Sequence, residues 1–265
     1  MNNTLKTVKL EKGEVTVYDY GEVKLHAYKT NDPLADEVFI VEKKGQAVII
    51  ESPCFFDNET ALSSYLDNLN VTVDGILVAY HAAGGNFSPN VKNYGTATAK
   101  AYAENGGGKA LIDNFTAAFG SSFDSKLHVI TEILPSGSVT IGGIDFVIKP
   151  NDEAYTIEIP EINAVYTHML GHDCHSIVAD DAHADAIISE LRGYIARGFG
   201  LILTSHYTPE NLKDAETKIR YIETLKYIAK KCGNADGFKR AVNDKYPDYS
   251  GKNYLDMTAN MFFKG

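Results

Sequence analysis

"GILVAYHAAGGNFSP", residues 75–89, joins an apolar segment to a loop of small residues. Ile76–Tyr80 is a short run bounded by turn residues, which is typical of a buried β-strand. The run delivers a histidine, His81, into the loop that follows it. Loops held at the ends of rigid strands often carry functional side chains. The stretch therefore predicts a site at this strand end, and His81 is its first candidate.

Composition limits the class of protein and of partner. The chain has 265 residues, 44% hydrophobic and 23% charged, which is enough apolar sequence for a large globular core. Its formal net charge of −10 argues against a nucleic-acid or anionic-membrane partner. No signal-peptide core or apolar span is found, and three scattered cysteines fit neither a disulfide framework nor a structural zinc site. We expect a cytoplasmic protein with a small-molecule substrate or ligand; the oligomeric state stays open.

The order of elements predicts the fold class. Short β-type runs fill the first fifty residues and recur between about 127 and 168, and each series is followed by a helix and a buried strand. Helices are expected at 58–69, with Asn58 as N-cap, and at about 182–197; the glycines at 106–108 are interpreted as a linker. This pattern predicts an α/β protein in which two sheets pack face to face with helices outside. We expect one domain over 1–265, with pseudo-duplicated halves at about 1–125 and 126–265.

Histidines recur where apolar runs end. His168 and His206 each follow such a run, as His81 does, and "HMLGHDCHS" at 168–176 adds further donors. Imidazole, carboxylate and thiolate groups are the ligands that zinc and iron prefer. The alternative is that each histidine only makes structural hydrogen bonds. By the same reasoning, Cys54 and Cys174 are either buried structural thiols or nucleophiles beside a histidine.

Most of the chain, from "VFIVEKKGQAVIIESP" to "TSHYTPENLKDAETKIRYIETLK", resembles the metallo-β-lactamase superfamily. In that family a hairpin and a helix precede a strand ending in Thr-His-x-His-x-Asp-His, and "AYHAAGGN" (79–86) stands in that place. His81 matches the first histidine. Ala83, Gly85 and Asn86 replace the second histidine, the aspartate and the last histidine. The resemblance implies a four-layer αββα sandwich of two mixed sheets in which most of the metal motif is lost.

Three later segments resemble the rest of the family's site. "PNDEAYTIEI" occupies the region of another family histidine, with Asp152 or Glu153 as the nearest substitute. "VYTHMLGHDCH" resembles the segment of the metal-bridging aspartate, and places His168 at that position. "LTSHYTPE" matches the final motif, so His206 corresponds to the last family ligand.

The resemblance implies a degenerate site that holds at most one metal ion. Three neutral imidazoles, from His81, His168 and His206, bind one zinc or iron ion with an open position for water, or no metal binds at all. The first hypothesis is a metal-dependent hydrolase of an ester, thioester, amide or lactone, with Asp173 or Glu153 as general base. The pocket candidates are Tyr80, Asn86, Cys54, His172 and His175.

Two alternatives follow from the same residues. The first is a metal-free small-molecule-binding or regulatory protein, in which Ala83, Gly84 and Gly85 leave a roomier pocket. The second is metal-free catalysis by Cys54 or Cys174, which requires a base within hydrogen-bond reach.

Overall fold

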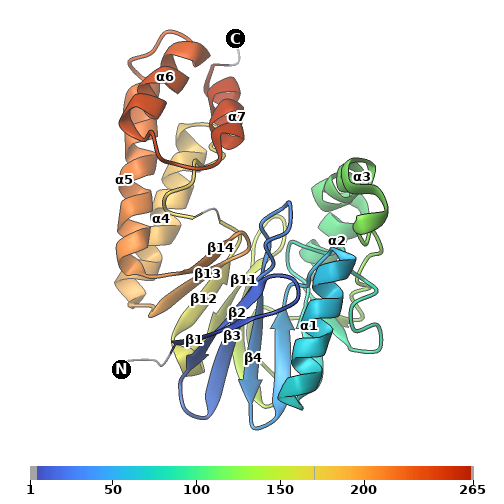
Figure 1. Ribbon diagram of the computed structural model, residues 1–265. Helices are drawn as coiled ribbons and strands as arrows, with labels where there is room; N and C mark the ends of the chain where they lie inside the picture. Colours follow the sequence, from blue (N-terminus) through green and yellow to red (C-terminus); the bar gives the residue numbers. More distant parts are fainter. Residues whose placement is uncertain (1–4, 170, 264–265) are drawn as a thin grey trace. The chain divides into compact units, whose positions relative to one another are not determined.

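Two β-sheets form the centre of the computed structural model, which describes residues 5–169 and 171–263 (Figure 1). The first sheet runs in sequence order: β1 Leu5–Lys9, β2 Glu14–Asp19, β3 Val23–Lys29, β4 Glu37–Lys43, β5 Gln46–Ile50, β6 Thr72–Leu77, β7 Asn93–Gly95 and β8 Glu132–Ile133. The second sheet has the order β14-β13-β12-β11-β10-β9: β9 Gly137–Ile141, β10 Ile144–Pro150, β11 Tyr155–Ile159, β12 Ala164–Thr167, β13 Leu201–Thr204 and β14 Tyr207–Glu210.

The first sheet is mixed, and it faces the second sheet. Its strands β1 to β5 pair antiparallel, whereas β5 to β8 pair parallel. The ring of Phe39 on β4 lies 6.1 Å from that of Tyr166 on β12, edge to face. The segment Glu37–Val41 is buried throughout, as expected for a strand that is covered on both faces. The predicted face-to-face packing of two sheets is confirmed.

Helix α1, Phe56–Leu69, runs beside the first sheet, where His26 Nδ1 lies 2.8 Å from Tyr65 Oη (Figure 1). The predicted N-cap is wrong. The helix begins two residues earlier, and Asn58 is fully buried because its side-chain amide donates to Tyr28 Oη and the Thr30 carbonyl, each at 2.8 Å.

The glycines at 106–108 do not form a linker. Helix α2, Ala97–Asn105, ends at Gly106, and helix α3, Gly107–Phe119, begins at once. A Cβ at Gly108 would lie 2.8 Å from the ring of Tyr102, and one at Gly106 would lie 2.9 Å from its Cα. The glycines therefore allow a tight corner between two helices.

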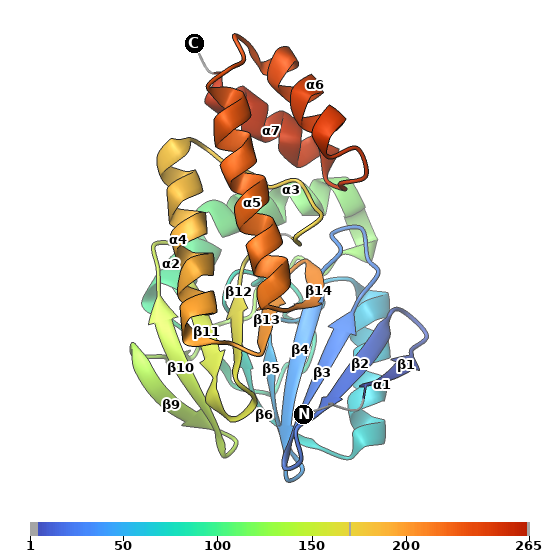
Figure 2. The same ribbon diagram turned by 90° about the vertical axis from the view of Figure 1, so that its left-hand side faces the viewer.

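The described residues group into two compact units: 5–169 with 203–209, and 171–202 with 210–263. The second unit is helical and contains α4 Asp181–Arg197, α5 Leu212–Ala229, α6 Ala235–Lys245 and α7 Lys252–Phe262. Helices α4 and α5 lie side by side, with an Arg192–Glu223 ion pair at 2.8 Å (Figure 2). None of the described helices is long and apolar enough to cross a membrane. A single domain built from duplicated halves stays a prediction.

Candidate metal centre

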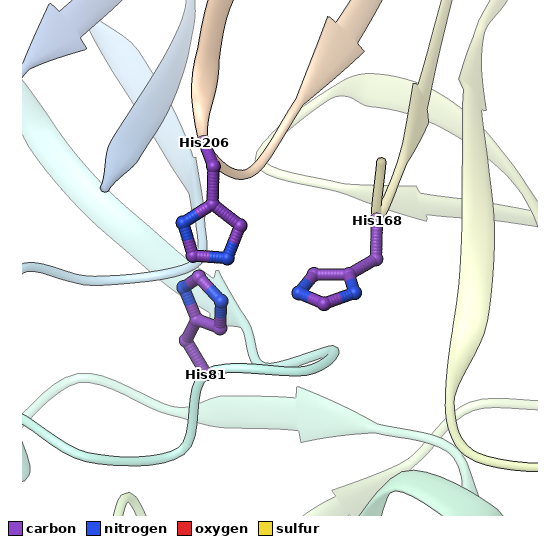
Figure 3. A group of neighbouring side chains, drawn as sticks. All are labelled: His81, His168 and His206. Atoms are coloured by element: carbon purple, nitrogen blue, oxygen red, sulfur yellow. The ribbon is translucent and has the colours of Figure 1, made fainter. Parts of the chain in front are cut away.

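Three histidines far apart in the sequence converge within the first unit, residues 5–169 with 203–209 (Figure 3). His81 lies four residues after β6, His168 directly follows β12, and His206 occupies the turn between β13 and β14. The ring centroids are 4.8 Å (81 to 206), 5.2 Å (168 to 206) and 5.4 Å (81 to 168) apart. One nitrogen from each ring lies within 4.8 Å of those from the other two. This spacing suits three ligands of a single ion.

A buried carboxylate, Asp36, stands behind two of the rings. Its Oδ1 lies 3.2 Å from Nδ1 of His206 and 3.7 Å from Nδ1 of His81. Burial alone would raise the pKa of Asp36, but the two histidines outweigh it and lower the pKa to about 2. Burial likewise opposes protonation of His206, but the hydrogen bond and the charge of Asp36 raise its pKa. Asp36 is therefore ionised and lies beside both imidazoles, and the Leu34 carbonyl is 3.2 Å from Nδ1 of His206 as its hydrogen-bond partner.

The donor set fits a metal ion. Because Asp36 faces the Nδ1 atoms, the Nε2 atoms of His81 and His206 are left for a ligand, and Figure 3 shows each ring turning a nitrogen toward the other two. A carboxylate or backbone carbonyl at the distal nitrogen is the usual support of a metal-bound histidine, and His206 has the Leu34 carbonyl in that place. Desolvation, and then the nearby rings of His81 and His206, lower the pKa of His168, although solvent still reaches part of this residue. The lowered pKa keeps the imidazole of His168 neutral, which is the form that binds metals, whereas a metal ion at His206 must displace a proton from Nε2.

A second buried carboxylate, Glu51, fixes the backbone that carries His81. Glu51 follows β5, and its oxygens accept the backbone N–H groups of Ala79 at 3.3 Å, Tyr80 at 2.8 Å and His81 at 3.1 Å. The hydroxyl of Tyr166 in the second sheet also donates to Glu51. These bonds end the strand and direct His81 toward the other histidines.

Backbone packs closely against the two glycines of the 81–86 loop, of which Gly85 stands where the family has its aspartate. A Cβ at Gly85 would lie 2.4 Å from the Leu127 carbonyl oxygen, and one at Gly84 would lie 2.2 Å from that of Pro53. Gly84 also has φ +90°, a conformation that favours glycine. The expectation that these glycines leave a roomier pocket is wrong for Gly84 and Gly85, because neighbouring backbone fills the space.

The three histidines open onto a cavity of about 130 Å³. Tyr80 and Cys54 line it, as predicted, and the Tyr80 ring stacks on His168 at 4.4 Å and 16°. Asn86 does not line it, because its amide donates to Asp124 Oδ1 at 2.9 Å. Glu153 is also absent from the lining; it is exposed and follows β10 in a turn bonded by Asn151. Asn86 and Glu153 therefore do not lie in the lining of this cavity.

Cys54 is a poor nucleophile. Its Sγ donates to Asp36 Oδ2 at 3.3 Å, and burial and the charge of Asp36 raise its pKa well above the usual range. A thiol held in that state is not the reactive thiolate.

The other candidates belong to the helical unit, where they bind residues of that unit. His172 Nδ1 lies 2.7 Å from Glu210 Oε1, and His175 Nδ1 lies 2.9 Å from Tyr221 Oη. The Asp173 carbonyl accepts the backbone N–H of Ser250, and the Cys174 thiol donates to the carbonyl of its neighbour at 3.4 Å. Each of these contacts lies within the helical unit.

Sequence reasoning missed Asp36 and Glu51. Each lies beside a β-strand, Asp36 just before β4 and Glu51 just after β5. The sequence did contain a signal for them, because each is an acidic residue at the end of an apolar run, and the same criterion identified the three histidines.

Comparison with known proteins rests on structure alone. No protein-family profile matches the sequence, and no curated protein matches it significantly. The fold is similar to that of the sec-alkylsulfatase Pisa1 from Pseudomonas sp. (TM-score 0.62, 13% identity, 96% of this chain and 50% of that chain). It is also similar to a metallo-β-lactamase from Erythrobacter litoralis (TM-score 0.54, 13% identity, 83% of this chain and 100% of that chain). A third similar structure is a metallo-β-lactamase family protein from Thermus thermophilus (TM-score 0.56, 12% identity, 88% of this chain and 91% of that chain).

The chain spans about half the length of the alkylsulfatase. The two mixed sheets with flanking helices, together with these likenesses, confirm the predicted fold class. The chain adopts the fold of the metallo-β-lactamase superfamily.

Proposed function

We propose that this protein is a metal-dependent hydrolase with one zinc or iron ion held by His81, His168 and His206. The observation that carries the proposal is the convergence of three imidazoles on one point. An ionised carboxylate, Asp36, lies behind two of them, beside their Nδ1 atoms. Three histidines with an open fourth position form a typical catalytic donor set for zinc. The 81–86 loop supplies one of the four ligands of the family motif, and this favours one metal ion over the two-metal arrangement of the resembling family.

The ion would activate a water molecule and polarise the bond to be broken. The Leu34 carbonyl, 3.2 Å from Nδ1 of His206, accepts a hydrogen bond there, and Asp36 lies beside the same nitrogen, so the Nε2 lone pair stays available. Tyr80 limits the rotation of His168 by stacking on it. Among the described residues that line the cavity, Asp36 is the single carboxylate, and it is occupied by the histidines. The proposal therefore assigns no separate general base to this cavity.

The substrate class is a small molecule with a hydrolysable ester, thioester, amide or lactone. Hydrolysis breaks the bond between the acyl carbon and its heteroatom; the oxygen of water bonds to the acyl carbon, and a proton goes to the leaving group. Sulfate esters belong in a substrate screen as well, because one protein of similar fold is an alkylsulfatase.

Metal analysis of protein purified without an affinity tag tests the proposal. We expect about one equivalent of zinc or iron per chain, and a loss of metal and of ester hydrolysis in His206→Ala. His183→Ala is the matched control, because His183 is an exposed residue near the start of α4. If the untreated protein holds no metal and takes up neither zinc nor iron on titration, the hydrolase is excluded. The metal-free binding protein then becomes the better description.

A further inference from the structure

Part of the cavity wall is apolar and comes from one helix. Leu111, Ile112 and Phe115 of α3 line the cavity, together with Phe123 beyond the helix. These side chains offer no hydrogen bonds, whereas the histidines and Asp36 supply the polar part of the lining. A cavity with one polar end and an apolar wall recognises a molecule of the same two-part character.

The apolar wall is held in place by an aromatic cluster. Phe115 and Phe123 lie 6.0 Å apart between ring centroids, and Phe119 lies 5.2 Å from Phe55. Phe55 also contacts Phe123 at 5.6 Å. Such edge-to-face and tilted pairs are favourable beyond the area that they bury. The wall is therefore preorganised for a ligand.

The wall is also incompletely covered. Leu111 lines the cavity and is 45% exposed, so apolar surface faces water beside the three histidines. Burying that surface against an apolar group is favourable. The cavity volume of about 130 Å³ is close to that of an apolar cavity of roughly 150 Å³ that binds benzene. It therefore accommodates a group of about six carbons.

We propose that the substrate carries an apolar acyl or aryl group of about six carbons, which packs on Leu111, Ile112 and Phe115 while its hydrolysable bond lies at the three histidines. This inference rests on the proposed function. It selects, within the class of esters and amides, the medium-chain and aromatic acyl compounds over acetyl compounds.

Rates on a series of methyl esters, followed by titration of the acid that is released, test the inference with the zinc-loaded full chain. We expect kcat/KM for the hexanoate to exceed that for the acetate by about tenfold or more, since each methylene moved from water into apolar surroundings gives roughly a fourfold gain. Leu111→Gln should lower this hexanoate-to-acetate ratio by at least about threefold. Leu111 is chosen over Ile112 because Leu111 is exposed, so a polar side chain there costs less folding free energy than one at the buried Ile112.

Ile133→Gln is the matched control, because Ile133 is 54% exposed and does not line the cavity. It should keep the ratio of the unmodified chain. Equal rates on acetate and hexanoate, or a ratio that Leu111→Gln leaves unchanged, would overturn the inference while the hydrolase proposal stands.

If no ester, thioester, amide, lactone or sulfate ester is hydrolysed, the hydrolase proposal fails by itself. Calorimetric titration of the metal-free chain with hexanoate and acetate then still tests whether the apolar wall binds a six-carbon chain. Tighter binding of hexanoate that weakens in Leu111→Gln supports the inference. Equal binding of the two carboxylates, or tighter hexanoate binding unaffected by the substitution, contradicts it.

Discussion

The loop at 81–86 and the loop at 30–36 both contribute to the candidate site, but the first supplies a histidine and the second a carboxylate. The first stands where the resembling family has four metal ligands, yet it supplies only His81 and otherwise packs against neighbouring backbone. The second supplies Asp36, which is buried and faces His81 and His206. Negative charge at this site therefore comes from the loop before β4 and not from the loop after β6.

This difference shows that a lost motif need not leave a vacant space. The backbone N–H of Gly85 donates to the Lys126 carbonyl at 2.8 Å, and that of Gly84 donates to the Asp124 carbonyl at 3.0 Å. The Asp124 carboxylate also accepts from the backbone N–H of Asn86 at 2.7 Å. The 81–86 loop is thus built into the structure, and restoring a ligand there requires displacing backbone.

The largest expected effect comes from restoring the family aspartate. Gly85→Asp places a Cβ about where the Leu127 carbonyl lies, so we expect a loss of at least about 3 kcal/mol in the free energy of unfolding and no second metal ion. Urea unfolding and metal analysis measure the two outcomes. Gly233→Asp is the control, because a Cβ at Gly233 meets nothing within 4 Å. A stable variant that binds two metal ions would show that the loop is open after all.

Acidification should weaken the packing of the 81–86 loop. His128 donates its backbone N–H to the Ala82 carbonyl, and its Nε2 lies 2.8 Å from Ser52 Oγ. Burial lowers the pKa of His128 from 6.5 to about 4. As the pH falls, the unfolded chain therefore binds this proton before the folded chain does. Neutral His128 makes its full contribution to the free energy of unfolding above pH 6.5. That contribution, up to about 3 kcal/mol, is lost as the pH falls toward 4.

His128→Gln removes this contribution, so stability should depend less on pH between 6.5 and 4 in the variant than in the unmodified protein. Urea unfolding of the chelator-treated chains across this range measures the difference. His183→Gln, at an exposed position, should retain the original dependence. Parallel curves for the unmodified protein and His128→Gln would rule out the titration of His128 as a cause.

The smallest expected effect concerns the 30–36 loop. Asp36→Asn keeps the shape of the side chain but removes its charge, and should weaken zinc binding about 10- to 100-fold. Competition with a chromophoric chelator measures the affinity, and circular dichroism checks the fold. Asp67→Asn, at an exposed position on α1, serves as control. Unchanged affinity in Asp36→Asn would mean that the carboxylate plays no part in holding the metal ligands.

Several features could be predicted from the sequence because they depend on local pattern. Apolar runs followed by polar residues indicated the strands that end at His168 and His206, and helical spacing indicated α4 within one residue at its start. The turns at Lys44-Gly45 and Gly142-Gly143 have positive φ angles, as hairpins of this kind require. Local preferences in a sequence of this composition are strong enough to specify these elements.

Local pattern also misled in places. The run Gly106–Gly108 carries the signal of a flexible linker, yet packing against Tyr102 makes it a corner between helices. Asn58 has the residue type of an N-cap, but burial beside Tyr28 gives its amide other partners. In both positions contacts with other residues outweigh the local preference.

The sequence by itself determined the strands, the class of fold and the three histidines at strand ends, because apolar periodicity and residue type are local properties. The tertiary structure decided that Asp36 faces two of those histidines, that Glu51 holds the strand end, and that α3 supplies an apolar wall. These pairings join residues tens of positions apart, and only the register of the strands and the packing of the sheets bring them together.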